Sequence, residues 1–244
     1  MHIKYIRFTA FLICTHIIAS DNVSVTTSNS FEQNKERCLY QRDETLPFSH
    51  SAIEVILNND TIVDENFIEP LVKQLLTKKH AGQTVPKIYY ENDPQLIWYA
   101  GGIVNLWTGS IYHLGIRQYD GPAYSKTHKT KYATGCCFCM RYEEFKEFGG
   151  FDEIFPMYSE DVDLSLWIRA AGKQVWFVPD SKIWHKVSAS FGGEFSFGKL
   201  VRKAKGIFLL IKKHANLVQW LTLIVLLPIQ LIIVLLKLIF KVGR

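Results

Sequence analysis

The sequence predicts an α/β protein in which strands and helices alternate along one layered domain. Short apolar runs rich in isoleucine and valine recur between segments of helical periodicity, with glycines between several of them. With 244 residues, 48% of them hydrophobic, and a net charge of +5, the chain can bury one sizeable core. This composition excludes a disordered protein and a repeat protein.

The first 50 residues give no firm assignment. Residues 1–20 have a basic start, an apolar centre and small residues at the end, which is the outline of a signal peptide. The alternative is a buried first strand with its flanks, and we favour it because a signal peptide conflicts with the membrane orientation argued below. The polar, weakly patterned residues 21–50 indicate loop.

The first clear strand is AIEVILNND, residues 52–60. Its apolar run ends abruptly in polar residues, as a buried parallel strand does at its carboxyl end, where ligands of open α/β sheets gather. A helix is predicted over residues 64–79. Asp64 is expected at its N-cap, and Pro70 indicates either a break or an early first turn.

Aromatic and β-branched segments at residues 87–90, 97–109 and 110–115 predict short strands or a hairpin. Residues 131–141 are typical of another buried strand, and residues 143–150 of a short helix closed by glycine. Along the chain as a whole, predicted strands alternate with predicted helices, which favours one α/β layer structure.

The five cysteines do not predict a disulfide framework. Their number is odd, and three of them lie in GCCFCM, residues 135–140, which fits a reducing compartment. Their spacing is not that of a zinc site. We therefore expect small buried residues on a strand.

An acidic helix is predicted over MYSEDVDLSLWIRAAG, residues 157–172, with Ser159 as N-cap and Gly172 at the C-terminal end. The apolar positions of this helix recur at i, i+3, i+4 and i+7; they are Leu164, Trp167, Ile168 and Ala171. Its first turn holds Glu160, Asp161 and Asp163. Such carboxylates either complement the helix dipole or form a site, and the helix alone does not decide between the two.

Residues 173–179 are typical of a strand, and residues 181–186 of a terminal extended piece. Positive charge then gathers in residues 199–205 and 211–214, a pattern that indicates anionic lipid as a partner and not nucleic acid.

Residues 215–236 are apolar all round and long enough to cross a bilayer, so we predict a membrane helix. Pro228 is expected to kink it, and a re-entrant or interfacial segment is the alternative. The denser Lys and Arg on its N-terminal side place the preceding residues in the cytoplasm. The predicted organisation is an N-terminal segment of residues 1–50, a domain of residues 51–195, a basic juxtamembrane segment of residues 196–214 and the membrane helix.

The order of several motifs resembles the family 2 glycosyltransferases of the GT-A fold, and most closely their rhamnosyltransferase-like branch. The matching text is VILNNDTIVDENFIEPLV, IWYAGGIVNLWTG and the stretch from ATGCCFCMRYEEF to DSKIWHK, within residues 52–190. The resemblance implies a mixed sheet flanked by helices and a nucleotide-sugar as donor. Together with the membrane helix predicted above, this gives a membrane-associated enzyme with its catalytic domain in the cytoplasm.

The resemblance assigns a metal site to Asp60 and His185. The run Asn58, Asn59 and Asp60 occupies the place of the family's Asp-x-Asp, so Asp60 is expected to bind Mg²⁺ or Mn²⁺ that bridges the donor's diphosphate. Asn58 replaces the first aspartate and removes one negative charge. His185 matches the late histidine that in many relatives also approaches the metal or the diphosphate.

The acidic helix matches the family's Glu-Asp pair at Glu160 and Asp161. The resemblance makes Asp161 the general base that accepts the acceptor's hydroxyl proton, with an ordinary carboxylate pKa near 4. Asp163 is expected to position neighbours or to cap the helix. Thr134 and Gly135 fall where relatives pass backbone and hydroxyl groups close to the sugar and acceptor.

The nucleobase-binding βα units of the family are not recognisable in residues 1–51. The leading interpretation is an inverting transferase that moves rhamnose or another hexose to a lipid-linked or polysaccharide acceptor at the cytoplasmic face. The alternative is an inactive, truncated remnant that serves as a membrane-bound binding or partner subunit. A secreted protein led by a cleaved signal peptide is the third interpretation.

Overall fold

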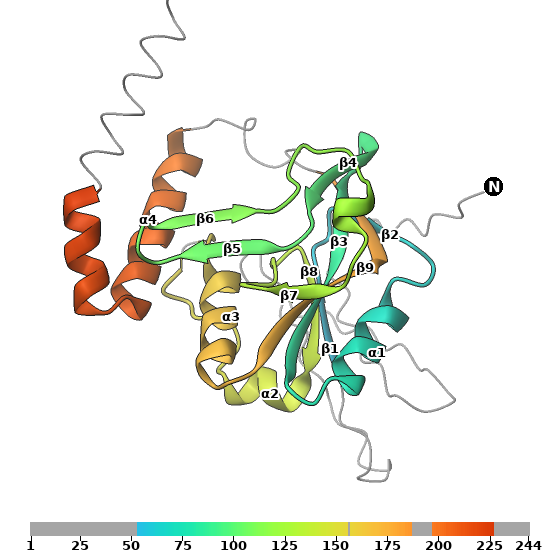
Figure 1. Cartoon of the computed structure of the whole chain (residues 1–244), viewed down its shortest axis with the longest axis horizontal. Coiled ribbons are helices and arrows are strands. Elements are labelled where there is room, and N and C mark those ends of the chain that lie inside the picture. Colours follow the sequence, from blue (N-terminus) through green and yellow to red (C-terminus); the bar gives the residue numbers. More distant parts are fainter. Residues whose placement is uncertain (1–52, 156, 187–196, 227–244) are drawn as a thin grey trace, which may run out of the picture.

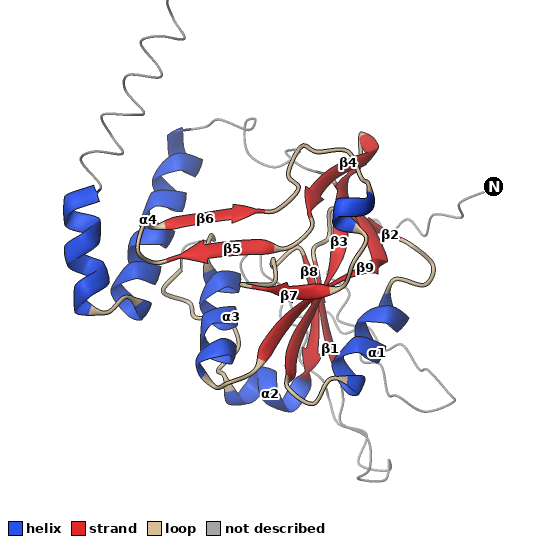
Figure 2. Ribbon diagram, in the orientation of Figure 1, coloured by secondary structure: helices blue, strands red, loops and turns tan. Residues whose placement is uncertain are grey.

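The computed structural model describes residues 53–155, 157–186 and 197–226 (Figure 1). The elements of the central layer are β1 (Ile53–Leu57), β2 (Thr61–Val63), β3 (Ala81–Tyr90), β4 (Asp93–Tyr99), β7 (His128–Thr130), β8 (Cys137–Arg141) and β9 (Gln174–His185). The remaining elements are α1 (Ile68–Thr77), β5 (Gly102–Asn105), β6 (Ser110–His113), a 3₁₀ turn (Pro122–Tyr124), α2 (Tyr142–Glu147), α3 (Glu160–Ala170) and α4 (Phe197–His214). This is the mixed α/β architecture that the sequence predicts, with helices around a central sheet (Figure 2).

The central sheet has seven strands and is built on a parallel pair, β3 and β9. Its main order is β1-β8-β3-β9-β2, and the other pairings within it are antiparallel. β8 borders the amino half of β3 and β4 borders its carboxyl half. On the side of β9 away from β3, β7 borders the amino half of β9 and β2 borders its carboxyl half. The expected parallel partner of β1 is not seen among the described strands, where β1 pairs antiparallel with β8.

β9 is one long strand with an irregularity near its middle, where two separate extended pieces are predicted from the sequence. Pro86 of β3 pairs with Val178, but the next residue, Lys87, pairs with Lys182. Residues 179–181 are therefore extra on β9 at this point, which a β-bulge accommodates by bending the strand. The hydroxyl of Ser181 in this bulge donates to the carbonyl of Phe67.

Helices α1 and α3 cover opposite faces of the sheet. The hydroxyl of Thr84 donates to the carbonyl of Leu71 on α1, whereas the side chain of its neighbour Gln83 accepts from Ser165 on α3. Successive side chains of a strand point to opposite faces, so the two helices lie on either side of β3. The fully buried side chains that fill the two resulting core layers include Ile53, Leu71, Leu75, Ile88, Phe138, Leu164, Ile168, Phe177 and Ile183.

One predicted helix start differs from the structure, and the other is confirmed without its expected capping bond. Helix α1 begins at Ile68, not at Asp64, and Pro70 lies in its first turn, where a missing N–H breaks no helical hydrogen bond. Ser159 occupies the N-cap of α3 but makes no capping hydrogen bond with its side chain, and its φ of 79° is left-handed. Trp167 is predicted to lie on the buried apolar face of α3, but it is 43% exposed.

The C-terminal part of the described chain is helical. Helix α4 is followed by a second helix over residues 217–226, and both contact the β5–β6 turn, since a Cβ at Gly109 would meet Ile211 and Leu223. None of the helices in the described ranges is both long and apolar enough to span a bilayer. Residues 227–236 of the predicted membrane helix lie outside the described residues, as does the N-terminal segment 1–50.

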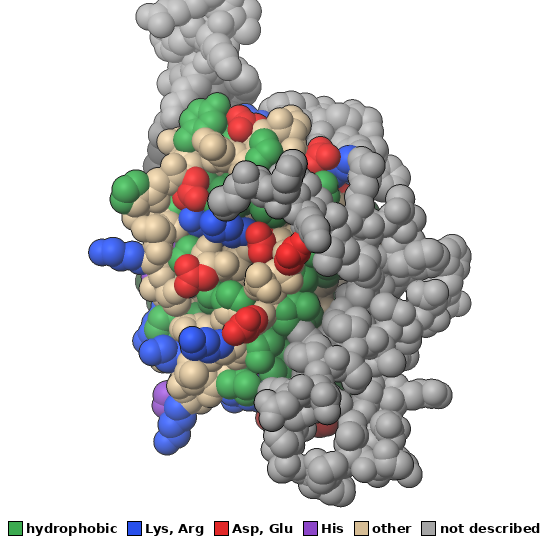
Figure 3. All heavy atoms as spheres, turned by 90° about the vertical axis from the view of Figure 1, so that its right-hand side faces the viewer, with side chains coloured by type: hydrophobic (Ala, Val, Ile, Leu, Met, Phe, Trp, Pro, Cys, Tyr) green, Lys and Arg blue, Asp and Glu red, His purple; other side chains and the backbone are tan. Residues whose placement is uncertain are grey.

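Charged side chains of both signs are interspersed on the described part of the face in Figure 3. The predicted basic segment corresponds to α4, which carries Arg202, Lys203, Lys205, Lys212 and Lys213. The net positive charge of the chain is therefore concentrated on one element, and the site described next lies beside it.

Candidate active site

The turn between β1 and β2 carries Asn58, Asn59 and Asp60. Asn58 donates its backbone N–H to the carbonyl of Cys136 at 2.8 Å and accepts the hydroxyl of Thr61 at 2.6 Å. The turn is thereby fixed against the loop of residues 131–136 that leads into β8. The sequence predicts residues 131–141 to be a strand throughout, but only Cys137–Arg141 form one.

Asp60 and His185 lie together, although 125 positions separate them along the chain. The Nε2 atom of His185 is 3.0 Å from an Asp60 carboxylate oxygen, because β2 pairs Thr61 with His185. The carbonyl of Asp60 also accepts the N–H of Lys186 at 2.8 Å. His185 is 9% exposed, and its Nδ1 has no hydrogen-bond partner among the described residues.

This pair fits a divalent cation that shares its ligands with a bound phosphate. One carboxylate and one imidazole with an unpartnered nitrogen are acceptable ligands for Mn²⁺, and the carboxylate for Mg²⁺. The described ranges hold no cluster of three or more histidine, cysteine or acidic side chains that could form a complete cage. A nucleotide-sugar diphosphate and water would have to supply the remaining ligands.

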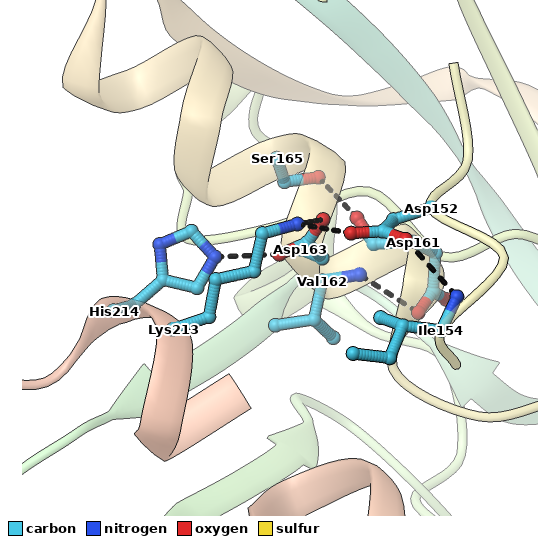
Figure 4. Close-up of polar contacts among 8 residues, drawn as sticks. All are labelled: Asp152, Ile154, Asp161, Val162, Asp163, Ser165, Lys213 and His214. Atoms are coloured by element: carbon cyan, nitrogen blue, oxygen red, sulfur yellow. Dashed lines mark hydrogen bonds and ion pairs between the residues drawn. The ribbon is translucent and has the colours of Figure 1, made fainter. Parts of the chain in front are cut away.

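Asp161 is held at the start of α3 by two backbone donors. Gly135 donates its N–H to Oδ2 at 2.7 Å. Val162 donates its own N–H to Oδ1 at 2.8 Å, and Figure 4 draws this second bond. Burial, with a smaller contribution from the charge of the neighbouring Glu160, raises the pKa of this carboxyl to about 6, although the backbone N–H donors oppose the shift. The sequence predicts an ordinary pKa, and the difference arises because the fold partly withdraws this carboxylate from water and places it beside Glu160.

The two candidate carboxylates, Asp60 and Asp161, flank Cys136. Burial raises the pKa of the Cys136 thiol well above its usual value, and the charges of both aspartates add to this effect. Thr134 is 4% exposed and shapes the loop, with its hydroxyl 3.4 Å from the N–H of Cys136. The structure therefore brings the β1–β2 turn, the Thr134–Gly135 loop and the start of α3 to one place.

Asp163 points elsewhere. Its carboxylate is buried and accepts from Lys213 at 2.7 Å and from His214 at 2.6 Å, both at the end of α4 (Figure 4). Lys213 also contacts Asp152 at 2.7 Å. The sequence assigned Asp163 to substrate binding or capping, whereas its contacts join α3 to α4.

His113, at the end of β6, is not among the site residues predicted from the sequence. Its Nδ1 lies 3.1 Å from the carbonyl of Trp98, which can only accept, so Nδ1 carries the proton and Nε2 keeps its lone pair. Burial lowers the pKa of His113 to about 4. The Trp98 ring contacts His113 at 4.5 Å and His185 at 4.6 Å between centroids, which joins this neutral imidazole to the site. Its only signal in the sequence was a histidine within an aromatic run.

Comparison with known families shows which family the chain belongs to. The family profile described as glycosyltransferase like family 2 matches residues 17–203, which is more than half of the chain. The chain belongs to this family. The match to glycosyltransferase family 2 begins within the first 50 residues, where we recognised no family motif.

Several family 2 relatives are similar to this chain. The O-antigen biosynthesis protein RfbC of Myxococcus xanthus is 30% identical over 59% of this chain and 12% of its own length. The rhamnosyltransferase WbbL of Escherichia coli is 25% identical over 68% of this chain and 64% of its own. An N-acetylglucosaminyl-diphospho-decaprenol L-rhamnosyltransferase of Mycobacterium tuberculosis is 39% identical over 24% of this chain and 19% of its own. The chain thus spans less than two thirds of each of these relatives.

A crystal structure of GalNAc-T7 with UDP, GalNAc and Mn²⁺ aligns with 66% of this chain and 31% of its own chain. The identity is 20% and the TM-score 0.46.

Proposed function

We propose that this glycosyltransferase family protein moves a sugar, with inversion, from a nucleotide-sugar to a hydroxyl of a lipid-linked or polysaccharide acceptor. The observation that carries the proposal is Asp161, a carboxylate held by two backbone N–H groups beside the Asp60–His185 pair. Two relatives are named rhamnosyltransferases, and one name includes a diphospho-decaprenol. L-Rhamnose is therefore the first sugar to test, and a prenyl diphosphate-linked sugar the first acceptor.

Asp161 is proposed as the base in this transfer. Its two oxygens each accept one backbone N–H, which fixes the carboxylate plane and leaves lone pairs for the acceptor hydroxyl. As the hydroxyl oxygen bonds to the anomeric carbon, its proton passes to Asp161, and the bond from that carbon to the diphosphate breaks on the opposite side. A pKa of about 6 leaves the base mostly ionised at neutral pH while making it a better proton acceptor than an ordinary aspartate.

Asp60 and His185 are proposed to hold Mg²⁺ or Mn²⁺. Such an ion, when bound, neutralises charge that develops on the diphosphate leaving group. Asn58 and Asn59 supply neutral amides beside it, and Glu160 adds charge next to Asp161. These retained groups favour an active transferase over the inactive-remnant alternative.

The direct test is a transfer assay with the full chain. Nucleotide-linked L-rhamnose and a prenyl diphosphate-linked N-acetylglucosamine are incubated with Mn²⁺, and the product is identified by mass spectrometry and its anomeric configuration by NMR. A product with the anomeric configuration opposite to that of the donor supports the proposal. Retention of configuration, or hydrolysis of the donor without transfer, contradicts it.

Metal dependence gives one expected result. UDP, used as a probe, should bind the wild type with Mn²⁺ and lose about tenfold or more in affinity in Asp60→Ala and His185→Ala, because each variant removes one ligand. Calorimetry with and without Mn²⁺ measures this. Glu65→Ala, an exposed acidic residue just after β2, is the matched control and should bind like the wild type. Metal-independent binding, or unchanged affinity in Asp60→Ala, contradicts the site.

The dependence of kcat/KM on pH gives a second expected result. Asp161 must be ionised to accept a proton, and its pKa is raised to about 6. We therefore expect kcat/KM to be constant above about pH 7 and to fall about tenfold per pH unit well below 6. An acid limb centred near 4 would mean that Asp161 has an ordinary pKa or is not the base.

We further propose that the C-terminal helices bind an anionic membrane surface on the cytoplasmic side. Large apolar side chains that are about half exposed or more gather on α4 and on residues 217–226; they are Leu200, Val201, Phe208, Leu217, Val218, Leu221, Ile224 and Val225. Lysines and an arginine flank them on α4. Apolar area combined with basic charge is typical of interfacial helices.

Vesicle binding tests this surface. The chain should sediment with phosphatidylglycerol vesicles more strongly than with phosphatidylcholine vesicles, because the basic residues add electrostatic attraction. The double variant Leu221→Ser, Ile224→Ser should bind severalfold less, since it removes exposed apolar area. Leu76→Ser, an exposed leucine on α1, is the control. Equal binding of all three proteins would contradict the surface.

A further inference from the structure

Lys203 on α4 has no anionic partner among the residues that the structure describes. Its Nζ lies 5.5 Å from the centroid of the Tyr158 ring, and it forms no ion pair with any described carboxylate. Lys213 at the other end of the same helix differs, because Asp152 and Asp163 both neutralise it. The charge of Lys203 is therefore available to a ligand.

The position of Lys203 relative to the base is fixed by close packing. A Cβ on Gly206 of α4 would lie 2.5 Å from the carbonyl oxygen of Tyr158 and 2.9 Å from the hydroxyl of Ser159, so only glycine permits this approach. Lys203 precedes Gly206 by three residues and shares its face of the helix. The loop that α4 contacts ends at Ser159, two residues before Asp161.

The charge of Lys203 also reaches His113, one of the aromatic residues of the site. After burial, the charges of His185 and Lys203 contribute to lowering the pKa of His113. His113 contacts Trp98, and Trp98 contacts His185. Close packing thus places Lys203 at the loop that leads to Asp161, and its charge acts on the cluster that includes the candidate metal ligand His185.

We propose that Lys203 binds a phosphate group of a substrate in this site. An exposed ammonium without a carboxylate partner is suited to phosphate oxygens, which accept strong charge-assisted hydrogen bonds. The inference rests on the proposed function, in which the nucleotide-sugar donor and a lipid diphosphate acceptor both carry such a group. The same helix presents the apolar surface described above, so a lipid-linked acceptor would bring its diphosphate to this side of the protein.

The test compares Lys203→Met with Lys203→Arg and with the matched control Lys205→Met, an exposed lysine of the same helix. The probes are UDP with Mn²⁺, farnesyl diphosphate, and farnesol as its uncharged counterpart, with dissociation constants measured by calorimetry. Lys203→Met should weaken one diphosphate probe about tenfold or more, Lys203→Arg should restore most of the affinity, and Lys205→Met should change nothing. If the variant binds UDP more weakly, Lys203 binds the phosphate of the donor. If it binds farnesyl diphosphate more weakly and farnesol equally well, Lys203 binds the phosphate of the acceptor.

Equal affinity of the wild type and Lys203→Met for both diphosphates, at matched Tm, overturns the role of Lys203 and leaves the proposed function standing. Failure of both diphosphates to bind the wild type overturns the proposed function as well. Lys203→Gln is a second neutral variant, so a folding defect peculiar to methionine does not decide the result. A loss that Lys205→Met shares equally would show nonspecific attraction to a basic helix and would also overturn the assignment.

Discussion

Asp161→Asn is expected to lower kcat by about 10² to 10⁴ while leaving the Tm close to that of the wild type. The substitution keeps the size of the side chain and one carbonyl oxygen, but it removes the lone pair that accepts the acceptor's proton. One of the two backbone N–H donors, Gly135 or Val162, loses its carboxylate oxygen, which costs about 1 kcal/mol.

A second effect offsets that cost. The folded state raises the pKa of Asp161, so folding stabilises the protonated form relative to the ionised one. At pH 7 the ionised carboxylate therefore costs stability, and a neutral amide relieves both its desolvation and its repulsion from Glu160. We measure kcat and Tm on the same preparations. A lowered Tm with near-normal kcat would mean that Asp161 is only a charge at the helix start.

Asp163→Asn is expected to give the opposite phenotype, a loss of about 3 kcal/mol in the free energy of unfolding with a small effect on kcat below the Tm. The Asp163 side chain is 3% exposed, pairs with Lys213 and accepts a hydrogen bond from His214. Without it, His214 loses its carboxylate and Lys213 keeps only Asp152. The buried end of α4 thus loses the carboxylate that both side chains share, which is why the expected loss is large.

Asp152→Asn is the matched control for this cluster, because its side chain contacts the same Lys213 Nζ but is 41% exposed. An exposed ion pair contributes at most about 1 kcal/mol. Urea unfolding of the two variants should therefore separate them by about 2 kcal/mol or more. Equal losses would show that the Asp163 cluster does not stabilise the docking of α4 on α3.

Elements with local signals could be predicted from the sequence. The acidic helix was expected within residues 157–172 and forms over Glu160–Ala170, because apolar periodicity and Gly172 define it locally. The short helix before Gly149 is confirmed for the same reason. The bend of β9 could not be predicted, since it arises from pairing with β3, whose residues lie about 90 positions earlier in the chain.

Some features of the candidate site could likewise be predicted from the sequence, and others could not. The motif spacing of the family led to Asp60, His185 and Asp161, and the structure places the first two 3.0 Å apart. Their catalytic roles remain predictions. The raised pKa of Asp161, the neutral state of His113 and the partners of Asp163 depend on burial and on α4, which no local pattern of residues reports.

The place of β9 in the sheet has a consequence for synthesis on the ribosome. β9 is the last strand of the described chain, yet it lies between β3 and β2. Until residues 174–185 emerge, one edge of β3 has no described partner, and an open strand edge is a template for association with other chains. His185 arrives with the same strand, so the Asp60–His185 pair forms only after this open-edge stage. We therefore expect the yield of folded protein to depend on how long this edge stays uncovered during synthesis.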